Sequence, residues 1–346
     1  MLQPCIFPGP SQPKDFSSIL QPILDELRIL EHRGMRVACA DGFVTAQAHL
    51  AFVGGDIPAQ SKAAGHSGHT HGFGCRFCLQ QGCYVDGRYT YPPVKAEEPI
   101  PQYRAVDSFK TINEQYAQKM VSPFSDLRIF HGTFFFPIDV MHLIGSNIGR
   151  QIHRITQGKY DVETGINPLR LNSSQSRMID RCIAESRPLI PSTFSGNVKS
   201  LSDDGFLRAV DWIHILRFIV PTVIVDSIKD KTCQATLNNI AQISNILCHP
   251  QVDTSSISVL HECITYWHQF LLDLTTKSCL HQGVFTINQH FLTHIPKLLH
   301  CMGPMHSYSA FSNERIIGEF KARIRSKKSP GKNASNVLVD FAALRR

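Results

Sequence analysis

No long uncharged apolar run occurs among the 346 residues of this chain. The most apolar stretch, residues 206–225, contains three charged side chains and a proline, so it falls short of a transmembrane span. We expect a buried core helix there and no membrane partner. The first residues, MLQPCIFPGPSQPKDF, have no apolar segment behind a basic start, which argues against a secretory signal.

Common nucleotide-binding and hydrolase motifs are also absent. The sequence has no Walker A motif, no Gly-rich dinucleotide fingerprint and no G-x-S-x-G elbow. Charged residues make up only 18% of the chain and hydrophobic residues 42%, which excludes a disordered protein and allows one large core or two moderate ones. The net charge of +7 is mildly basic, which is compatible with nucleic-acid binding without requiring it.

The cysteines do not form a disulfide framework. There are 11 of them, an odd number at irregular spacing, so reduced thiols in the cytosol or nucleus are favoured. Most of them fit the pattern of ordinary buried thiols. Only Cys75, Cys78 and Cys83 cluster in the sequence.

Periodicity predicts an α/β fold with a large helical block. Residues 16–34 have helical spacing that stops at Gly34, and residues 35–56 predict two strands around a turn at Asp41–Gly42, the second ending near Asp56. Residues 61–104 are rich in loop-forming residues. Helices are predicted at 108–120, 139–156, 173–187, 205–246 with a break at Pro221, and 254–275, followed by short helices in 286–299 and 311–326.

Two distant pairs of soft ligands are the most informative motif. Cys75 and Cys78 form a C-x-x-C, which supplies half of a tetrahedral zinc site, and His290 and His294 form an H-x-x-x-H on one face of a predicted helix. Each pair alone is equally well explained by buried thiols or by packed imidazoles. Rival ligands that would complete a local site are His66, His69, His71 and Cys83.

Two acidic residues stand at similar distances from these pairs. Asp56 lies 19 positions before Cys75, and Glu314 lies 20 positions after His294. Metal-dependent nucleic-acid enzymes hold two Mg²⁺ ions with about three clustered carboxylates, so these residues are candidates for such a site. A turn residue beside two glycines would equally explain Asp56, and an exposed helix acid would explain Glu314.

A third acid and a group of basic residues complete the candidates. Asp139 fits the cap of a helix that also carries His142, with a second acidic ligand as the alternative. Basic residues crowd the end of the helix bearing Glu314, where they would suit either the helix dipole or contacts to DNA phosphates. They are Lys321, Arg323, Arg325, Lys327 and Lys328.

Six segments, in this order along the chain, resemble the Tnp2-type transposases of CACTA (En/Spm) DNA transposons. They are LQPCIFPGPSQPKDFSSILQPILDELRIL, GGDIPA, GHTHGFGCRFC, FPIDVMHLIGSNIG, NQHFLTHIPKLLHCMGP and FSNERIIGEFKARIR, which together span nearly the whole sequence.

The resemblance implies a partial RNase H-like core of the DDE type, interrupted by a large helical insertion. The division would be 1–104 for the first part of the core, 105–285 for the insertion and 286–346 for the second part. Asp56 would be the second catalytic acid and Glu314 the third, both holding Mg²⁺. Cys75, Cys78, His290 and His294 would bind a structural Zn²⁺, which favours the long-range pairing over a local site. The D-x-x-H of Asp139 and His142 is also typical of the family.

The implied activity is Mg²⁺-dependent strand cleavage and transfer at transposon ends, in the nucleus. The partners would be transposon ends and target DNA, with a second copy of the chain as a further candidate. The family's first aspartate lies upstream of the PGP segment, and neither Asp15 nor Asp41 falls at its place, so we expect an incomplete and impaired active site. The alternative is a non-catalytic, zinc-stabilised remnant that binds DNA or a protein.

Overall fold

The structure is a computed structural model that describes residues 15–94, 98–191, 194, 198–202, 204–326 and 328–344. It is 56% helical, with a few short antiparallel strands. The chain divides into two compact units. Unit 1 consists of residues 1–51, 123–130 and 310–346, and unit 2 of residues 52–122 and 131–309. These units do not follow the predicted boundaries after residues 104 and 285.

Unit 1 begins with the predicted N-terminal helix. Helix α1 (Phe16–His32) starts where the Asp15 carboxylate accepts a hydrogen bond from the Ser18 amide at 3.1 Å. It ends just before Gly34, whose φ of +72° suits the left-handed turn that stops a helix. This helix was predicted correctly from its spacing and its terminal glycine.

The two predicted strands form a short, exposed hairpin instead of core strands. Strand β1 (Met35–Cys39) pairs antiparallel with β2 (Gly42–Ala46), in the register Met35↔Ala46. Phe43 is 63% exposed, and residues 47–56 have no strand structure. The prediction that the second strand extends to Asp56 was therefore wrong, because this stretch leaves the hairpin and continues into unit 2.

The C-terminal part of unit 1 contains two helices, α11 (Phe311–Arg323) and α12 (Pro330–Leu344). They contact each other through Phe320 and Phe341, whose ring centroids lie 5.1 Å apart, and the Arg323 guanidinium lies 4.4 Å from the Phe341 ring centroid. The asparagine side chain of Asn333 accepts hydrogen bonds from the Arg325 and Ser326 amides, which fixes the turn between the helices.

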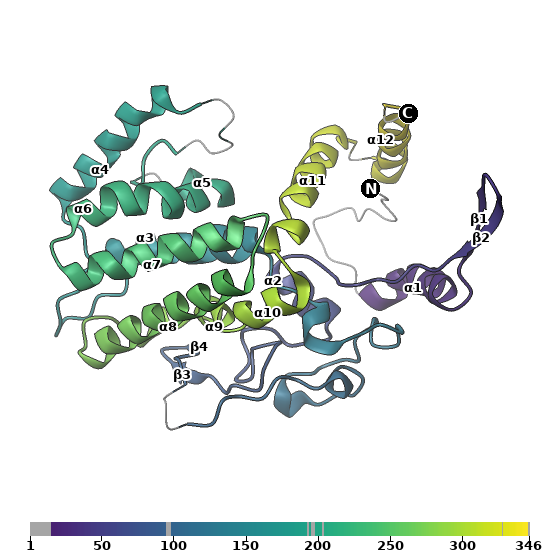
Figure 1. The fold of residues 1–346 in the computed structure, drawn as a ribbon, viewed down its shortest axis with the longest axis horizontal. Coiled ribbons are helices and arrows are strands. Elements are labelled where there is room, and N and C mark those ends of the chain that lie inside the picture. The colour runs from purple at the N-terminus through teal and green to yellow at the C-terminus, as the bar shows by residue number, and fades with distance from the viewer. Residues whose placement is uncertain are drawn as a thin grey trace. The chain divides into compact units, whose positions relative to one another are not determined.

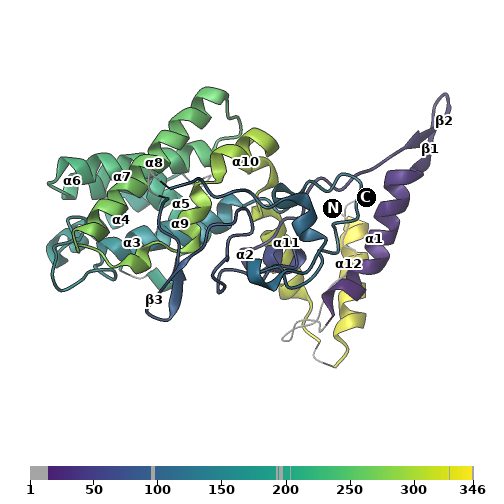
Figure 2. The same ribbon diagram turned by 90° about the horizontal axis from the view of Figure 1, so that it is seen from below.

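Unit 2 contains most of the helices. Helices α7 and α8 lie side by side in its middle (Figure 1) and remain adjacent in the perpendicular view (Figure 2). The α-helices of this unit are α2 (Ile57–Ala63), α3 (Arg150–Thr156), α4 (Ser173–Ser186), α5 (Ala209–His214), α6 (Val225–Ser227), α7 (Lys231–Cys248), α8 (Thr254–Thr276), α9 (Ile287–Leu292) and α10 (Ile295–Met302).

Two π-helical segments and several short 3₁₀ turns complete unit 2. The π-helices are η4 (Met141–Gly149) and η7 (Ile215–Ile224), and a short hairpin pairs β3 (Cys83–Val85) with β4 (Arg88–Thr90). The 3₁₀ turns are η1 (Val106–Phe109), η2 (Glu114–Tyr116), η3 (Gly132–Phe135), η5 (Arg187–Leu189), η6 (Asp204–Phe206), η8 (Gln282–Val284) and η9 (Met305–Tyr308).

Most of the predicted helices of unit 2 are present, with two corrections. Residues 108–120 contain only 3₁₀ turns and irregular backbone. The segment buries isolated side chains such as Phe109 and not one continuous helical face. The helix through Pro221 runs in wide π-helical turns to Ile224 and continues as α6 to Ser227. The break comes instead before Asp230, which caps α7 by accepting a hydrogen bond from the Cys233 amide.

Close packing of η4 against α5 requires glycine. A Cβ atom at Gly145 would lie 2.6 Å from the Ala209 carbonyl oxygen, and one at Gly149 would lie 2.9 Å from the Trp212 Cβ. These two glycines let η4, which begins beside Asp139, lie directly against α5 and the fully buried Trp212. None of the helices in the described part of the chain is both long and apolar enough to cross a membrane.

Candidate metal centre

The turn at Cys75–Cys78 presents two sulfur atoms from one side of the backbone. The Phe77 and Cys78 amides donate to the Cys75 sulfur at 3.3 and 3.4 Å, and the Gln80 amide donates to the Cys78 sulfur at 3.5 Å. These bonds orient both sulfurs and stabilise negative charge on them. Both cysteines are at most 1% exposed.

Arg104 holds this turn in place from behind. Its guanidinium donates to the carbonyl oxygens of Cys75 at 2.9 Å, Phe73 at 3.0 Å and Tyr116 at 2.7 Å. Because one planar, buried group binds three carbonyl oxygens and joins the 73–75 segment to Tyr116, the turn has little freedom to open. The backbone amide of Arg104 also donates to the Phe77 carbonyl, which fixes the segment around Arg104 against the turn.

The two histidines come from the end of α9 and the start of α10. His290 lies on α9, and His294 directly precedes α10 in a helical conformation, so the i, i+4 relation brings both rings to one face. Helix α9 is held by a chain of side-chain hydrogen bonds. The Trp267 indole donates to Gln289 at 2.8 Å, and the Gln289 amide group donates to Gln151 at 3.0 Å.

The structure brings all four predicted zinc ligands together. The side chains of Cys75, Cys78, His290 and His294 are buried, and one ligand atom from each lies within 4.8 Å of every other. The Cys75 sulfur is 3.3 Å from His294 Nε2, and the Cys78 sulfur is 3.2 Å from His290 Nε2. The two Nε2 atoms are 3.1 Å apart.

These distances fit a single tetrahedral ion. Zn–S bonds of about 2.3 Å and Zn–N bonds of about 2.0–2.1 Å require ligand atoms separated by roughly 3.3–3.8 Å. The three contacts between a sulfur and a ring nitrogen or between the two ring nitrogens, at 3.1–3.3 Å, are slightly shorter than this, and all four ligand atoms lie within 4.8 Å of one another. A cavity of about 300 Å³, lined in part by Cys78, His290 and His294, gives the cluster an access route.

The electrostatics of the cluster favour a metal thiolate. Burial opposes ionisation of Cys75, but its hydrogen bond with Cys78 and the charges of both histidines outweigh this and lower its pKa well below the ordinary value. The pKa of Cys78 is raised, because the Cys75 hydrogen bond, burial and the neighbouring charge oppose a second thiolate. Burial also lowers the pKa of His294, which keeps the neutral, metal-binding form. A divalent cation would relieve the repulsion between two thiolates.

Aromatic side chains surround the cluster. The Phe77 ring stacks on His294 with centroids 5.1 Å apart, and Tyr91 lies against His290 at 5.9 Å. The Tyr103 hydroxyl is 3.4 Å from His294 Nδ1, the position from which an outer-shell partner orients a metal-binding imidazole. Four protein side chains fill a tetrahedral donor set, which suits a closed, structural metal site.

The rival ligands do not join the cluster. Nδ1 of His66 accepts a hydrogen bond from the Gly68 amide at 3.0 Å, and Nδ1 of His71 accepts one from the Phe73 amide at 3.0 Å. His69 and Cys83 are exposed. Among the described residues, the Cys75–Cys78–His290–His294 cluster does not include His66, His69, His71 or Cys83.

Acid should destabilise the protein through His66. Burial, aided by the Arg104 charge, lowers the pKa of His66 to about 3, whereas an unfolded histidine titrates near 6.5. Between these values the unfolded chain binds a proton that the folded chain excludes, so the free energy of unfolding falls as the pH drops below about 6.5. We expect wild type to lose about 2 kcal/mol more than His66→Asn between pH 7 and pH 5 in urea unfolding. Asn Oδ1 can still accept from the Gly68 amide, and equal pH dependence of the two proteins would contradict this assignment.

The two candidate magnesium ligands belong to different units. Asp56 is exposed in unit 2 and caps α2, because its carboxylate accepts a hydrogen bond from the Ala59 amide at 2.7 Å. Glu314 is exposed in the first turn of α11 in unit 1. Within the described residues, no group of three or more such ligands other than the Cys–His cluster is present. The geometry thus supports the expected metal thiolate centre and leaves the magnesium site as a proposal.

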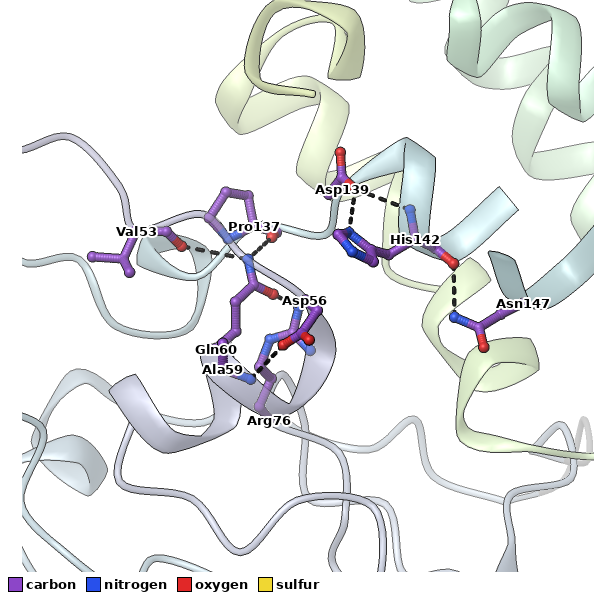
Figure 3. Close-up of polar contacts among 9 residues, drawn as sticks. All are labelled: Val53, Asp56, Ala59, Gln60, Arg76, Pro137, Asp139, His142 and Asn147. Atoms are coloured by element: carbon purple, nitrogen blue, oxygen red, sulfur yellow. Dashed lines mark hydrogen bonds and ion pairs between the residues drawn. The ribbon is translucent and has the colours of Figure 1, made fainter. Parts of the chain in front are cut away.

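Buried Asp139 and half-buried His142 form a pair at the start of η4. The Asp139 carboxylate accepts a hydrogen bond from the His142 amide at 2.9 Å and lies 2.7 Å from His142 Nδ1 (Figure 3). The Asp139 side chain is only 4% exposed. The cap predicted from the sequence is therefore present, and it also holds the imidazole.

The candidate DNA-contacting residues lie at and after the end of α11. Lys321, Arg323, Arg325 and Lys328 are exposed in unit 1, whereas Lys327 lies outside the described residues. Arg325 Nε donates to the Ala322 carbonyl at 2.8 Å, so this side chain also satisfies a carbonyl group in the last turn of α11.

Three buried residues around the centre were missed by sequence reasoning. Arg76, Arg104 and Gln60 are at most 4% exposed and make hydrogen bonds to distant backbone or side chains. Nothing in their local sequence distinguishes them from surface residues of the same type, except that Arg76 stands between the two cysteines.

A comparison with protein-family models found no match, and neither did a comparison with curated proteins.

Proposed function

We propose that this chain is a zinc-stabilised, DNA-processing protein of the Tnp2-type transposase lineage. The observation that carries the proposal is the convergence of four buried ligand atoms from Cys75, Cys78, His290 and His294. A local site built from neighbouring histidines would have been the simpler outcome for a C-x-x-C. The long-range pairing is the one that the resemblance implies.

In this proposal zinc has a structural role. A bound ion would tie the 75–78 turn to α9 and α10 across more than two hundred residues of chain. It would also hold the adjacent segments, including the RNase H-like portion that the resemblance implies, in a fixed arrangement.

The proposed reaction is phosphodiester cleavage at a DNA end followed by strand transfer. Asp56 and Glu314 would be the carboxylates that hold Mg²⁺, whose chemistry is to activate the attacking oxygen and to stabilise the leaving oxygen. The basic residues after α11 would contact DNA phosphates. Proteins of this kind act in the nucleus on transposon ends and target DNA, with self-association as a further proposal.

The second candidate function is DNA or protein binding without catalysis. It is favoured by one specific observation, which is that the Asp56 carboxylate has a complete structural explanation as the cap of α2. A zinc-stabilised fold with a basic segment needs neither acid for binding. Salt-dependent DNA binding that survives Glu314→Gln would be its signature.

Nicking of supercoiled plasmid DNA separates the two functions. We expect the zinc-loaded chain to nick DNA slowly with Mg²⁺ or Mn²⁺, in keeping with an impaired site, and Asp56→Asn to lower that rate at least about a hundredfold, because a metal-binding charge is lost. Asparagine still caps a helix, so α2 should remain folded. Asp253→Asn is the matched control, since Asp253 caps α8 through the Ser256 amide at 2.8 Å. The control should nick like wild type.

The other outcomes are equally informative. If wild type binds DNA without nicking it, the catalytic proposal fails and the binding function stands. Nicking that is unchanged in both Asp56→Asn and Glu314→Gln would also contradict the assignment of these acids.

A further inference from the structure

Arg76 connects the metal-ligand turn to helix α2. Its guanidinium leaves the turn between Cys75 and Cys78 and is fully buried. One terminal nitrogen donates to Gln60 Oε1 at 2.5 Å, and Nε donates to the Phe136 carbonyl at 3.3 Å. The same group lies over the rings of Phe77 and Phe291, 4.8 and 4.9 Å from their centroids.

Gln60 continues this connection to two acid-bearing segments. It lies on α2, one turn after Asp56, and its amide group donates to the Pro137 carbonyl and to the Val53 carbonyl (Figure 3). Pro137 is two residues before Asp139. One buried side chain therefore holds together the segment before Asp56, the helix that Asp56 caps and the segment that leads to Asp139.

Burying Arg76 has an energetic cost that packing alone does not explain. No carboxylate pairs with this guanidinium in the described part of the chain, and its second terminal nitrogen is buried without a hydrogen-bond partner; burial lowers the pKa of Arg76, and the charge of Cys75 offsets this only in part. Burial of a charge without such a partner is unfavourable, and an apolar side chain of similar volume would be more stabilising at many such positions. The hydrogen bonds from Arg76 to Gln60 and Phe136 are thus better explained by the geometry that they fix.

We propose that Arg76 and Gln60 are positioning residues. Their hydrogen bonds connect the Cys75–Cys78 turn to the segments carrying Asp56 and Asp139, so that a fixed turn also fixes these two segments. The inference rests on the proposed function only in regarding Asp56 as an acid of the reaction. The connection itself is a property of the fold. Its consequence is that metal binding and the placement of Asp56 are coupled.

Hydrogen exchange of the zinc-loaded chain tests this coupling. Gln60→Met keeps the volume and removes the hydrogen bonds to Arg76, Pro137 and Val53, so we expect amides of residues 57–62 and 138–143 to exchange roughly tenfold faster while one zinc per chain is retained. Gln118→Met is the matched control. Gln118 is equally buried and donates to two carbonyl oxygens, of Ala64 and Met120, but it does not contact Arg76. Because Gln118 contacts the end of α2 at Ala64, the control discriminates through residues 138–143, which should stay as protected as in wild type.

A conservative variant separates positioning from general stability. Gln60→Glu keeps an acceptor for Arg76 and loses the donor to Pro137. It should restore slow exchange in residues 57–62 but not in 138–143. Unchanged exchange in Gln60→Met, or equal loss in Gln118→Met, would overturn the inference.

Plasmid nicking keeps this inference separate from the proposed function. If wild type nicks DNA, Gln60→Met should lower the maximal rate about tenfold at saturating Mg²⁺, with Gln118→Met unaffected. If wild type does not nick while the exchange pattern is as expected, the proposed catalysis fails and the positioning role stands.

Discussion

Replacing Cys75 with serine is expected to abolish metal binding and to unfold unit 2 in large part. Four buried ligands share one centre, and loss of a thiolate leaves a buried, incomplete donor set. Apparent binding energies of structural zinc sites are about 10–16 kcal/mol, because binding and folding are coupled. We therefore expect the free energy of unfolding to fall by at least about 5 kcal/mol. Metal analysis and urea unfolding of the purified chain measure both effects.

A matched cysteine provides the control for this substitution. Cys233 on α7 is equally buried, at 1% exposure, and lies outside the cluster. Cys233→Ser should retain one zinc per chain and lose only about 1–3 kcal/mol, the cost of burying a poorly paired hydroxyl group. If Cys75→Ser kept its zinc and resembled Cys233→Ser in stability, the assignment of Cys75 as a ligand would be wrong.

Replacing Gly65 with alanine is expected to have the second largest effect. Gly65 follows α2 with a φ of +73°, and a Cβ atom there would lie 2.1 Å from the Met120 carbonyl oxygen. The left-handed conformation alone costs about 1–2 kcal/mol for a non-glycine residue. The overlap with backbone adds about 1–3 kcal/mol, because the neighbouring segment cannot move aside like a flexible side chain. We expect a total loss of about 2–5 kcal/mol in urea unfolding with zinc present.

Gly87 separates the two contributions. It has a similar φ of +80° in the β3–β4 turn, and nothing lies within 4 Å of a Cβ atom built there. Gly87→Ala should therefore lose only the conformational part, about 1–2 kcal/mol. Equal losses at both positions would contradict the close packing of residues 118–120 against the end of α2, the helix that carries Asp56.

Local patterns in the sequence predicted the regular helices well. Helix α8 was predicted almost to the residue, because apolar spacing continues throughout it; in the structure Asp253 caps its start. Helix α1 was equally clear from its spacing and from Gly34. The hairpin β1–β2 was located by Asp41–Gly42, but the length of its second strand was not. An apolar run such as residues 50–53 has the same pattern whether it pairs as a strand or crosses into another unit.

The candidate site was predictable in its ligands and not in its surroundings. Spacing alone did not show that the Cys75–Cys78 pair and the His290–His294 pair bind the same ion. Only the resemblance favoured one shared centre. Arg76 and Gln60 were not predictable, because whether an arginine is buried depends on chain segments as distant as residues 136 and 291. The π-helical course of η7 through Pro221 was also missed, since proline normally indicates a break.

X-ray absorption at the zinc edge tests the central claim most directly. The protein as purified should contain one zinc per chain. Its first shell should hold two sulfur atoms at about 2.3 Å and two imidazole nitrogens at about 2.0–2.1 Å. Protein that is folded without metal, or a shell that lacks either the sulfur or the imidazole ligands, would show that the thiolates and the imidazoles do not share an ion.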